Sequence, residues 1–174
     1  MIPGPQSTFP TLLVEDAVQT LLDQTLNQFN ACLERVWTTW TTFDGQTVIR
    51  NLPKVEPDRI YITEAIDPLQ CPAIFIVPDK TEYNNVSQNI VHQVHSIMIG
   101  FLLEDIESTT LARLTWRYVA AGYEAYHDKN LGNIHTLIES VDYGPIFRKG
   151  KGDGRQFRKD ATLRLRVTHL ERYY

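Results

Sequence analysis

Residues 160–170 have the sequence DATLRLRVTHL, in which apolar and polar side chains alternate. In an extended chain one side carries Ala161, Leu163, Leu165 and Val167, and the other carries Thr162, Arg164, Arg166 and Thr168. This period of two predicts a β-strand with one face against a core. Residues 137–147 also favour a strand, in which Pro145 marks an edge or a bulge. The two segments together predict a closing β-hairpin.

The connection of this hairpin, RKGKGDGRQFRK (148–159), holds six of the chain's 17 basic residues. Residues 148–172 hold nine basic and three acidic residues, a net of +6, and the rest of the chain holds eight basic and 18 acidic residues, a net of −10. Three interpretations stay open: a soluble loop, contact with a nucleic-acid backbone, or docking on an acidic protein surface. The six residues are Arg148, Lys149, Lys151, Arg155, Arg158 and Lys159.

Two amphipathic helices are predicted, over residues 11–35 and 110–129. Both repeat apolar residues three and four positions apart, and Leu111, Leu114, Tyr118, Ala121, Ala125 and Tyr126 form the stripe of the second. Ser108 or Thr109 is expected to cap the second helix, and residues 130–132 (NLG) to end it. Residues 1–10, rich in Pro, Gly, Ser and Thr, predict an extended arm.

Further segments favour strands. Residues 37–43 (WTTWTTF) and 46–50 flank an Asp-Gly pair and predict a hairpin, whereas the rival interpretation extends the first helix through Trp40. The proline-bracketed run 72–78 predicts a central strand, and residues 60–63 a short one. A turn is expected at residues 83–85. Residues 91–103 predict a long strand, in which Gly100 marks a bulge or a close approach and one face carries His95, Ile97, Ile99, Phe101 and Leu103.

These elements predict a single α+β domain over residues 11–174, with a mainly antiparallel sheet of four to six strands and two long helices on one face. A chain of 174 residues that is 43% hydrophobic can bury such a core. Cys32 and Cys71 are expected to be core thiols in a reducing compartment. No apolar run approaches the ~20 residues of a membrane span, and the first residues do not resemble a signal peptide, so we expect a cytoplasmic origin.

No motif for catalysis, a metal or a cofactor is present in the sequence, so no enzyme is expected. The glycines at 150, 152 and 154 match neither phosphate-loop pattern, and a strand follows them where a helix is needed. No nucleophile motif occurs. Glu104, Asp105 and Glu107 are interpreted as a solvated turn before a helix, in preference to an acid–base or cation site. The five histidines are scattered, with His92 and His95 on opposite faces of a strand.

Several aromatic residues suggest a partner. Trp116 and Tyr123 lie seven positions apart and off the apolar stripe of the second helix, so they give this helix a second apolar face. Tryptophan and tyrosine are enriched in protein interfaces. The candidate oligomer interface consists of Trp37, Trp40, Trp116 and Tyr123.

In this order the elements resemble the tail terminator (tail completion or neck) proteins of long-tailed bacteriophages. The likeness spans residues 11–172. It rests on the helix around Glu15-Asp16-Ala17-Val18, the strand Pro72 to Pro78, the long strand into Glu104-Asp105, the helix Leu111 to Tyr126 and the closing hairpin with its basic tip. The resemblance implies a small α+β sandwich and a hexameric ring that ends the tail tube, without catalysis or a cofactor. The stretch 37–57 is longer than that family needs, which keeps a head-completion or adaptor protein as an alternative.

The resemblance also implies partners and a location. We expect a homo-oligomer, a hexamer, that meets the tail tube protein on one face and the head connector or stopper protein on the other, in the tail or neck of a virion assembled in the host cytoplasm. The basic hairpin would dock on the tube or line the DNA channel, with DNA as a neighbour and no membrane involved. The competing class, a small enzyme or ligand-binding module, predicts a pocket with convergent polar groups and a monomer or dimer.

Overall fold

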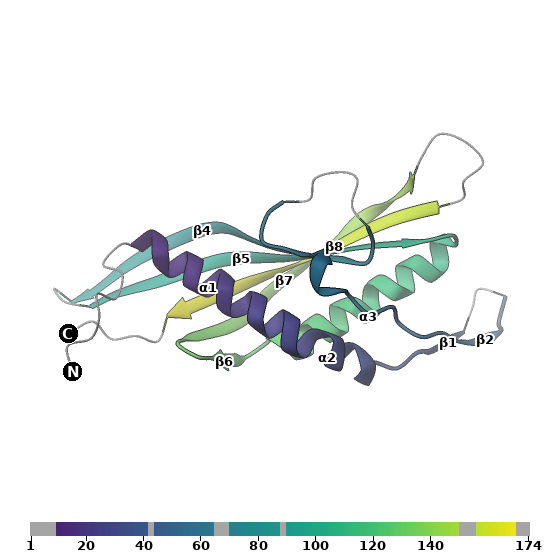
Figure 1. The fold of residues 1–174 in the computed structure, drawn as a ribbon, viewed down its shortest axis with the longest axis horizontal. Helices are drawn as coiled ribbons and strands as arrows, with labels where there is room; N and C mark the ends of the chain where they lie inside the picture. The colour runs from purple at the N-terminus through teal and green to yellow at the C-terminus, as the bar shows by residue number, and fades with distance from the viewer. Residues whose placement is uncertain (1–9, 42–43, 65–69, 88–89, 150–155, 170–174) are drawn as a thin grey trace.

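A computed structural model describes residues 10–41, 44–64, 70–87, 90–149 and 156–169 (Figure 1). The helical elements are α1 (Pro10–Gln24), the π-helical η1 (Thr25–Phe29), α2 (Asn30–Arg35), the 3₁₀ turn η2 (Pro57–Arg59) and α3 (Ser108–Tyr126). The strands are β1 (Thr39–Thr41), β2 (Thr47–Ile49), β3 (Ile60–Tyr61), β4 (Ala73–Ser87), β5 (Ile90–Asp105), β6 (Lys129–Leu131), β7 (Ile134–Lys149) and β8 (Gln156–His169). Of the predicted arm, residues 1–9 lie outside the described part, and Pro10 begins α1.

Six strands form one sheet in the order β3-β4-β5-β8-β7-β6. The neighbours from β4 to β6 are antiparallel, as expected, but β3 runs parallel to β4, so the sheet is mixed. The alternation predicted for residues 160–170 is confirmed, since Leu163 and Leu165 of β8 are buried opposite Ile99 and Ile97 of β5. A separate two-stranded ribbon pairs β1 with β2.

The helices lie on one face of this sheet, with α3 over β5, β8 and β7 and α1 over β4 (Figure 1). The prediction of two long helices is only half right. The helical path from residue 10 to 35 is interrupted by η1, and α3, with 19 residues, is the longer unbroken helix. At the start of η1 the Thr25 hydroxyl donates to the Leu21 carbonyl (2.7 Å) and bonds the Tyr126 hydroxyl (2.6 Å). Such back-bonding competes with the regular helix ladder and favours a local irregularity.

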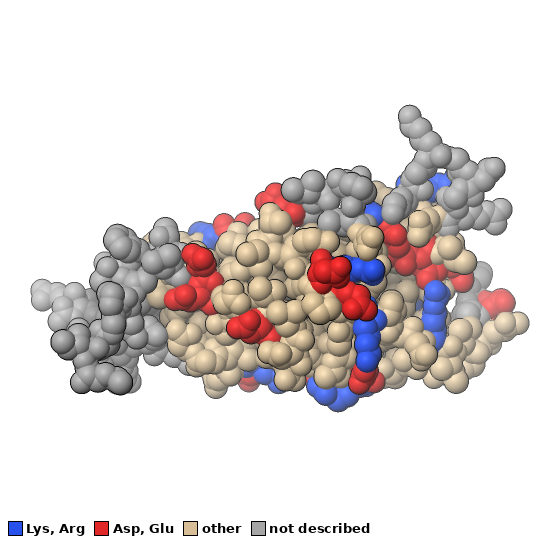
Figure 2. All heavy atoms as spheres, in the orientation of Figure 1, with Lys and Arg blue, Asp and Glu red and all other residues tan. Residues whose placement is uncertain are grey.

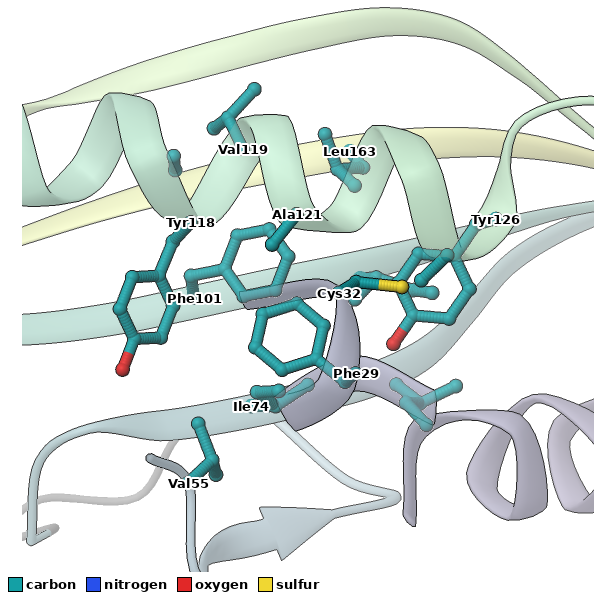
Figure 3. Packing of buried hydrophobic residues seen from close by; sticks show 14 of the residues in the cluster. Phe29, Cys32, Val55, Ile74, Phe101, Tyr118, Val119, Ala121, Tyr126 and Leu163 are labelled. Atoms are coloured by element: carbon teal, nitrogen blue, oxygen red, sulfur yellow. The ribbon is translucent and has the colours of Figure 1, made fainter. Parts of the chain in front are cut away.

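The core lies between the helices and the sheet (Figure 3). The Phe29 ring stacks on Phe101 of β5 with 5.3 Å between ring centroids, and Tyr118 of α3 meets Phe101 edge-on at 6.0 Å. The Tyr118 hydroxyl donates to the Pro53 carbonyl, which ties the segment before η2 to this core. Aromatic packing of this kind joins three parts of the chain that are distant in sequence.

Several local predictions are settled by the strands. The hairpin at residues 37–50 is confirmed by the Trp40–Val48 pair, and the rival helix is wrong because α2 ends at Arg35. The turn expected at residues 83–85 is also wrong: β4 continues to Ser87, and cross-strand pairing with β5 overrides the local turn preference of the asparagines. Pro145 does mark a bulge, between Tyr143 and Ile146.

Gly100 marks neither a bulge nor a close approach, because a Cβ atom there would have no neighbour nearer than 3.8 Å.

The boundaries of α3 differ from the prediction at both ends. The helix begins at Ser108, with Glu107 in the N-cap position and no side-chain capping bond. It ends at Tyr126, before the positive-φ residue Asp128 (φ 51°), whereas Gly132 (φ 58°) forms the turn from β6 to β7. No helix within the described ranges is long and apolar enough to cross a membrane.

Candidate protein-interaction site

The basic residues of the closing hairpin that the structure describes differ in their surroundings: some lie at the end of β7, and others are paired inside the sheet. Arg148 is exposed near the end of β7, and Lys149 ends that strand. Arg158 and Lys159 belong to β8, inside the sheet. The Arg158 Nε donates to Glu104 Oε1 at 2.7 Å, and the buried Lys159 ammonium donates to the Gly144 carbonyl. Lys151 and Arg155 lie outside the described residues.

Arg158 is therefore expected to stabilise the fold in addition to any role in binding. An Arg158→Gln change removes this ion pair from the Glu104 carboxylate, whose side chain is 11% exposed, and should lower the free energy of unfolding by about 1–3 kcal/mol. Arg148→Gln, an exposed residue of the same hairpin, is the matched control and should change it by less than about 0.5 kcal/mol. Urea denaturation measures both, and equal values for the two variants would contradict a structural role for Arg158.

The acidic cluster is paired, in contrast to the solvated turn that the sequence suggested. Glu104 bonds Arg158, and the buried Asp105 accepts a bond from the Arg50 guanidinium at 2.5 Å. The Glu107 carboxylate accepts a bond from the Thr110 hydroxyl at 3.0 Å. These carboxylates hold the junction of β5 and α3 in place, and their bonds give them a structural role.

Among the aromatic residues of the candidate interface, the structure distinguishes one from the rest. Trp40 is buried in the core of its own domain, at 5% exposure, and is not available on the surface. Trp37 is 71% exposed, Tyr123 53% and Trp116 48%. The Arg117 guanidinium lies over the Trp37 ring, 5.0 Å from its centroid, and its Nε donates to the Trp37 carbonyl at 3.2 Å.

Two arginines accompany the exposed tryptophans. Arg113 and Arg117 are four residues apart on α3, with Trp116 between them, so these side chains are neighbours on one side of the helix. Burial and then Arg113 lower the pKa of Arg117, which agrees with two cations held close together. Neither arginine has an ion-pair partner within the described ranges. We call this patch the tryptophan–arginine surface; its members are Trp37, Arg113, Trp116 and Arg117.

The opposite face of the sheet carries no helix in the described part of the chain, and it has an apolar hollow. Its volume is about 490 Å³. This feature was not predicted from the sequence, although Phe75 and Val77 of β4, and Met98 and Leu102 of β5, alternate with the core residues of their strands. We call it the sheet hollow; its lining residues are Glu64, Phe75, Val77, Met98, Gly100, Phe101, Leu102, Pro145, Phe147, Asp160 and Thr162.

Charged residues surround the sheet hollow. At one end Arg158 pairs with Glu104, and on the other side Arg164 pairs with Asp79. Glu64 and Asp160 line the hollow itself and have no ion-pair partner among the residues that the structure describes. The patch therefore combines an apolar centre with a charged rim, an arrangement that also occurs in protein interfaces.

Both outer edges of the long-stranded part of the sheet are poor templates for adding a strand. β4 pairs with β3 only at Ile74 and Phe75, and farther along it carries Pro78, which has no N–H, and a register shift. β7 pairs with β6 over residues 134–136 and then has two bulges, one of them at Pro145. Proline, bulges and charge are the devices by which sheets avoid edge-to-edge pairing, so contacts with other molecules are favoured through faces.

The histidines and cysteines show no grouping for a metal. Within the described ranges no three His, Cys, Asp or Glu side chains gather. His95 and His169, which the sequence left apart, do meet: their rings are edge-on with 5.0 Å between centroids. Cys32 is buried and Cys71 half-buried, and within the described part neither forms a disulfide. Burial raises the pKa of the Cys32 thiol, with a smaller effect of Glu124, so this thiol is poorly suited to act as a nucleophile.

Figure 2 shows the side of the molecule on which α1 lies, where acidic and basic side chains are scattered over a mostly uncharged surface. No continuous basic stripe crosses the described part of this side, in contrast to the surface expected of a dedicated nucleic-acid binder.

No family model and no curated protein matches this chain. Among solved structures 23 chains match, and one of them belongs to the "Virion of native gene transfer agent (GTA) particle". That neighbour is 16% identical, with a TM-score of 0.36, and the match covers 64% of this chain and 80% of the neighbour's chain. The chain is thus weakly similar to one component of a virion, and at this TM-score the likeness carries no argument about function.

Proposed function

We propose that this chain is a structural protein of a bacteriophage virion, which forms a homo-oligomeric ring at the end of the tail tube, terminates the tube and mediates its joining to the head. One observation carries the proposal: the described part of the chain presents two different surfaces with exposed aromatic or apolar side chains, on opposite sides of the sheet. The tryptophan–arginine surface lies on the helix side, and the sheet hollow lies on the bare side of the sheet. An exposed tryptophan beside arginines and an apolar hollow with a charged rim are both features that protein interfaces share.

Two unlike surfaces on opposite sides favour a ring over a simple dimer. A two-fold dimer uses the same patch on both subunits, whereas joining unlike patches head to tail gives a ring when the rotation closes. A ring that ends a tube has two open faces for different partners. In this proposal these partners are the tail tube protein and the head connector or stopper protein, and a head-completion or adaptor protein remains the alternative role.

The basic hairpin suits such a neck position. Arg148 is exposed, and Lys149, Lys151 and Arg155 follow it in the sequence, so several copies in a ring would concentrate positive charge at one rim or in the lumen. We propose that these residues contact the tube or lie beside DNA in the channel, whereas Arg158 and Lys159 serve the fold. The role needs neither catalysis nor a cofactor.

The test is the mass of the purified chain and the phenotype of its loss. Native mass spectrometry and negative-stain microscopy should show a closed ring of six copies, alone or after mixing with tail tubes. In the particle-producing host, a stop codon in this gene should give tubes of uncontrolled length beside unjoined heads. A strict monomer with a bound small molecule, or normal particles without the protein, would refute the proposal and favour a ligand-binding module.

A further inference from the structure

We infer, on the basis of the proposed ring, that the sheet hollow of one copy receives the tryptophan–arginine surface of the next copy. Trp37 is the apolar anchor in this contact, and Arg113 and Arg117 face Glu64 and Asp160 of the neighbour. The occupant of the hollow is thus a second copy of this chain.

The shape of the hollow is suited to a large flat side chain. Gly100 lies in its floor and has no side chain, and a Cβ atom there would reach Phe75 and Thr162 only at van der Waals distance, 3.8 and 3.9 Å, so the floor is shallow at this residue and is not overpacked. Phe75 is held in place by stacking on Tyr61, with 5.3 Å between the ring centroids. The Phe147 side chain, 52% exposed, forms part of the rim. A volume of about 490 Å³ is large enough to accept an indole ring with neighbouring atoms.

The charges of the two surfaces are opposite and are unpaired in their own copy. Glu64 and Asp160 line the hollow and have no ion-pair partner within the described ranges, whereas Glu104 and Asp79 nearby are neutralised by arginines. On the other side of the molecule Arg113 and Arg117 have no carboxylate partner in the described part of the chain. Asp160, Arg113 and Arg117 are half-buried and Glu64 is exposed, so each surface presents charges that the opposite charges of the other surface can pair with.

Tryptophan and arginine are also the residue types that dominate binding energy at protein interfaces. Trp37 is 71% exposed, yet it is held by the Arg117 guanidinium over its ring and by the bond from Arg117 Nε to its carbonyl. A side chain that is exposed and already positioned loses little conformational entropy on binding. The two surfaces lie on opposite sides of the sheet, so one copy cannot satisfy both, and the contact is head to tail.

The experiment uses the full chain and single substitutions, with ring formation followed by native mass spectrometry and analytical ultracentrifugation. Trp37→Ala should weaken the contact between copies at least about 30-fold. Glu64→Arg and Arg117→Glu should each weaken it, and the double variant, in which the charges are exchanged, should recover most of the loss. Tyr83→Ala removes another exposed aromatic side chain, 52% exposed and eight positions beyond Phe75 on β4, and should leave the ring intact.

A mixing test shows that the contact is head to tail. Gly100→Leu should fill the hollow, and Trp37→Ala removes the anchor, so neither variant should form rings alone. Mixed together, the intact Trp37 of the first variant can enter the intact hollow of the second, and one-to-one heterodimers should appear without rings. If Gly100→Leu does not fold, the Trp37 and charge-exchange variants still decide the question.

The outcomes separate this inference from the proposed function. If the parent chain forms a ring and Trp37→Ala and the charge variants form the same ring with unchanged stability, the inference is wrong and the ring role stands. If the parent chain stays monomeric at every concentration and beside tail tubes, the ring role fails and the inference fails with it.

Discussion

Replacing Gly122 with leucine is expected to lower the free energy of unfolding by about 3 kcal/mol or more, because overpacking of a rigid core is strongly unfavourable. Gly122 lies on the buried side of α3, where the helix approaches the sheet. A Cβ atom there would come within 2.6 Å of Leu163 Cδ1 and 2.8 Å of Phe101 Cζ. Both neighbours are fully buried in the core shown in Figure 3, so they have little room to move.

The matched control introduces the same residue two positions away. Ala120 is exposed on the same helix, and Ala120→Leu should change stability by less than about 0.5 kcal/mol. Gly122→Ala tests whether the clash of the Cβ atom is the cause of the destabilisation. In a helix interior, alanine normally stabilises the protein by about 1 kcal/mol relative to glycine, and here the clash should cancel that gain. Thermal and urea denaturation measure all three variants. A Gly122→Leu protein as stable as the Ala120→Leu protein would mean that α3 does not pack this closely on β5 and β8.

Acidification from pH 6.5 to pH 4 is expected to destabilise the protein through His95. This residue is fully buried on β5, and its Nδ1 shares a hydrogen bond with the Thr81 hydroxyl at 2.9 Å. Burial, and then the adjacent His169, lower the pKa of His95 from 6.5 to about 4. Between pH 6.5 and pH 4 the His95 side chain is protonated in the unfolded chain but stays neutral in the folded chain. The contribution of neutral His95 to the free energy of unfolding is therefore complete above pH 6.5 and is lost as the pH falls towards 4.

The size of this effect follows from the difference between the two pKa values. Each pKa unit corresponds to 1.36 kcal/mol, so neutral burial of His95 contributes about 3 kcal/mol of pH dependence. His95→Asn keeps a polar group near Thr81 but cannot titrate, and its unfolding free energy should vary less between pH 4.5 and 7. Ile97→Val, on the same strand and face, is the control: it should lower stability by about 1 kcal/mol and keep the full pH dependence. If the unfolding free energy of the His95→Asn variant changes with pH as steeply as that of the parent, His95 is not the origin of the pH dependence.

The parts of the fold that could be predicted from the sequence are those in which apolar residues recur with a clear period. The alternation of residues 160–170 and of 91–103 identified the two central strands and their buried faces, because side chains of a strand point to opposite sides in turn. The apolar stripe of α3 was found for the same reason at a period of 3.6. Boundaries that depend on tertiary pairing, such as the continuation of β4 to Ser87, left no local signal.

The interaction surfaces were less predictable, because they combine residues that only the sheet register brings together. Met98 lies beside Val77 across one strand pair, and Pro145 and Phe147 come from a third strand. The sequence assigned Arg158 to a loop tip, but β8 begins at Gln156 and places that side chain against Glu104, 54 positions away. Trp40 was expected to be part of the interface, and it is instead buried by packing in the core of its own domain.

The interrupted edges of the sheet bear on association between copies of the chain. Exposed strand edges can pair with the edges of other copies and so template fibrils at high protein concentration. Pro78 and the bulge beside it in β4, and the two bulges of β7, interrupt the stretches of these edges that β3 and β6 leave unpaired. Growth of one continuous sheet from copy to copy is therefore disfavoured at these edges, whereas contacts through the faces of the sheet are not affected.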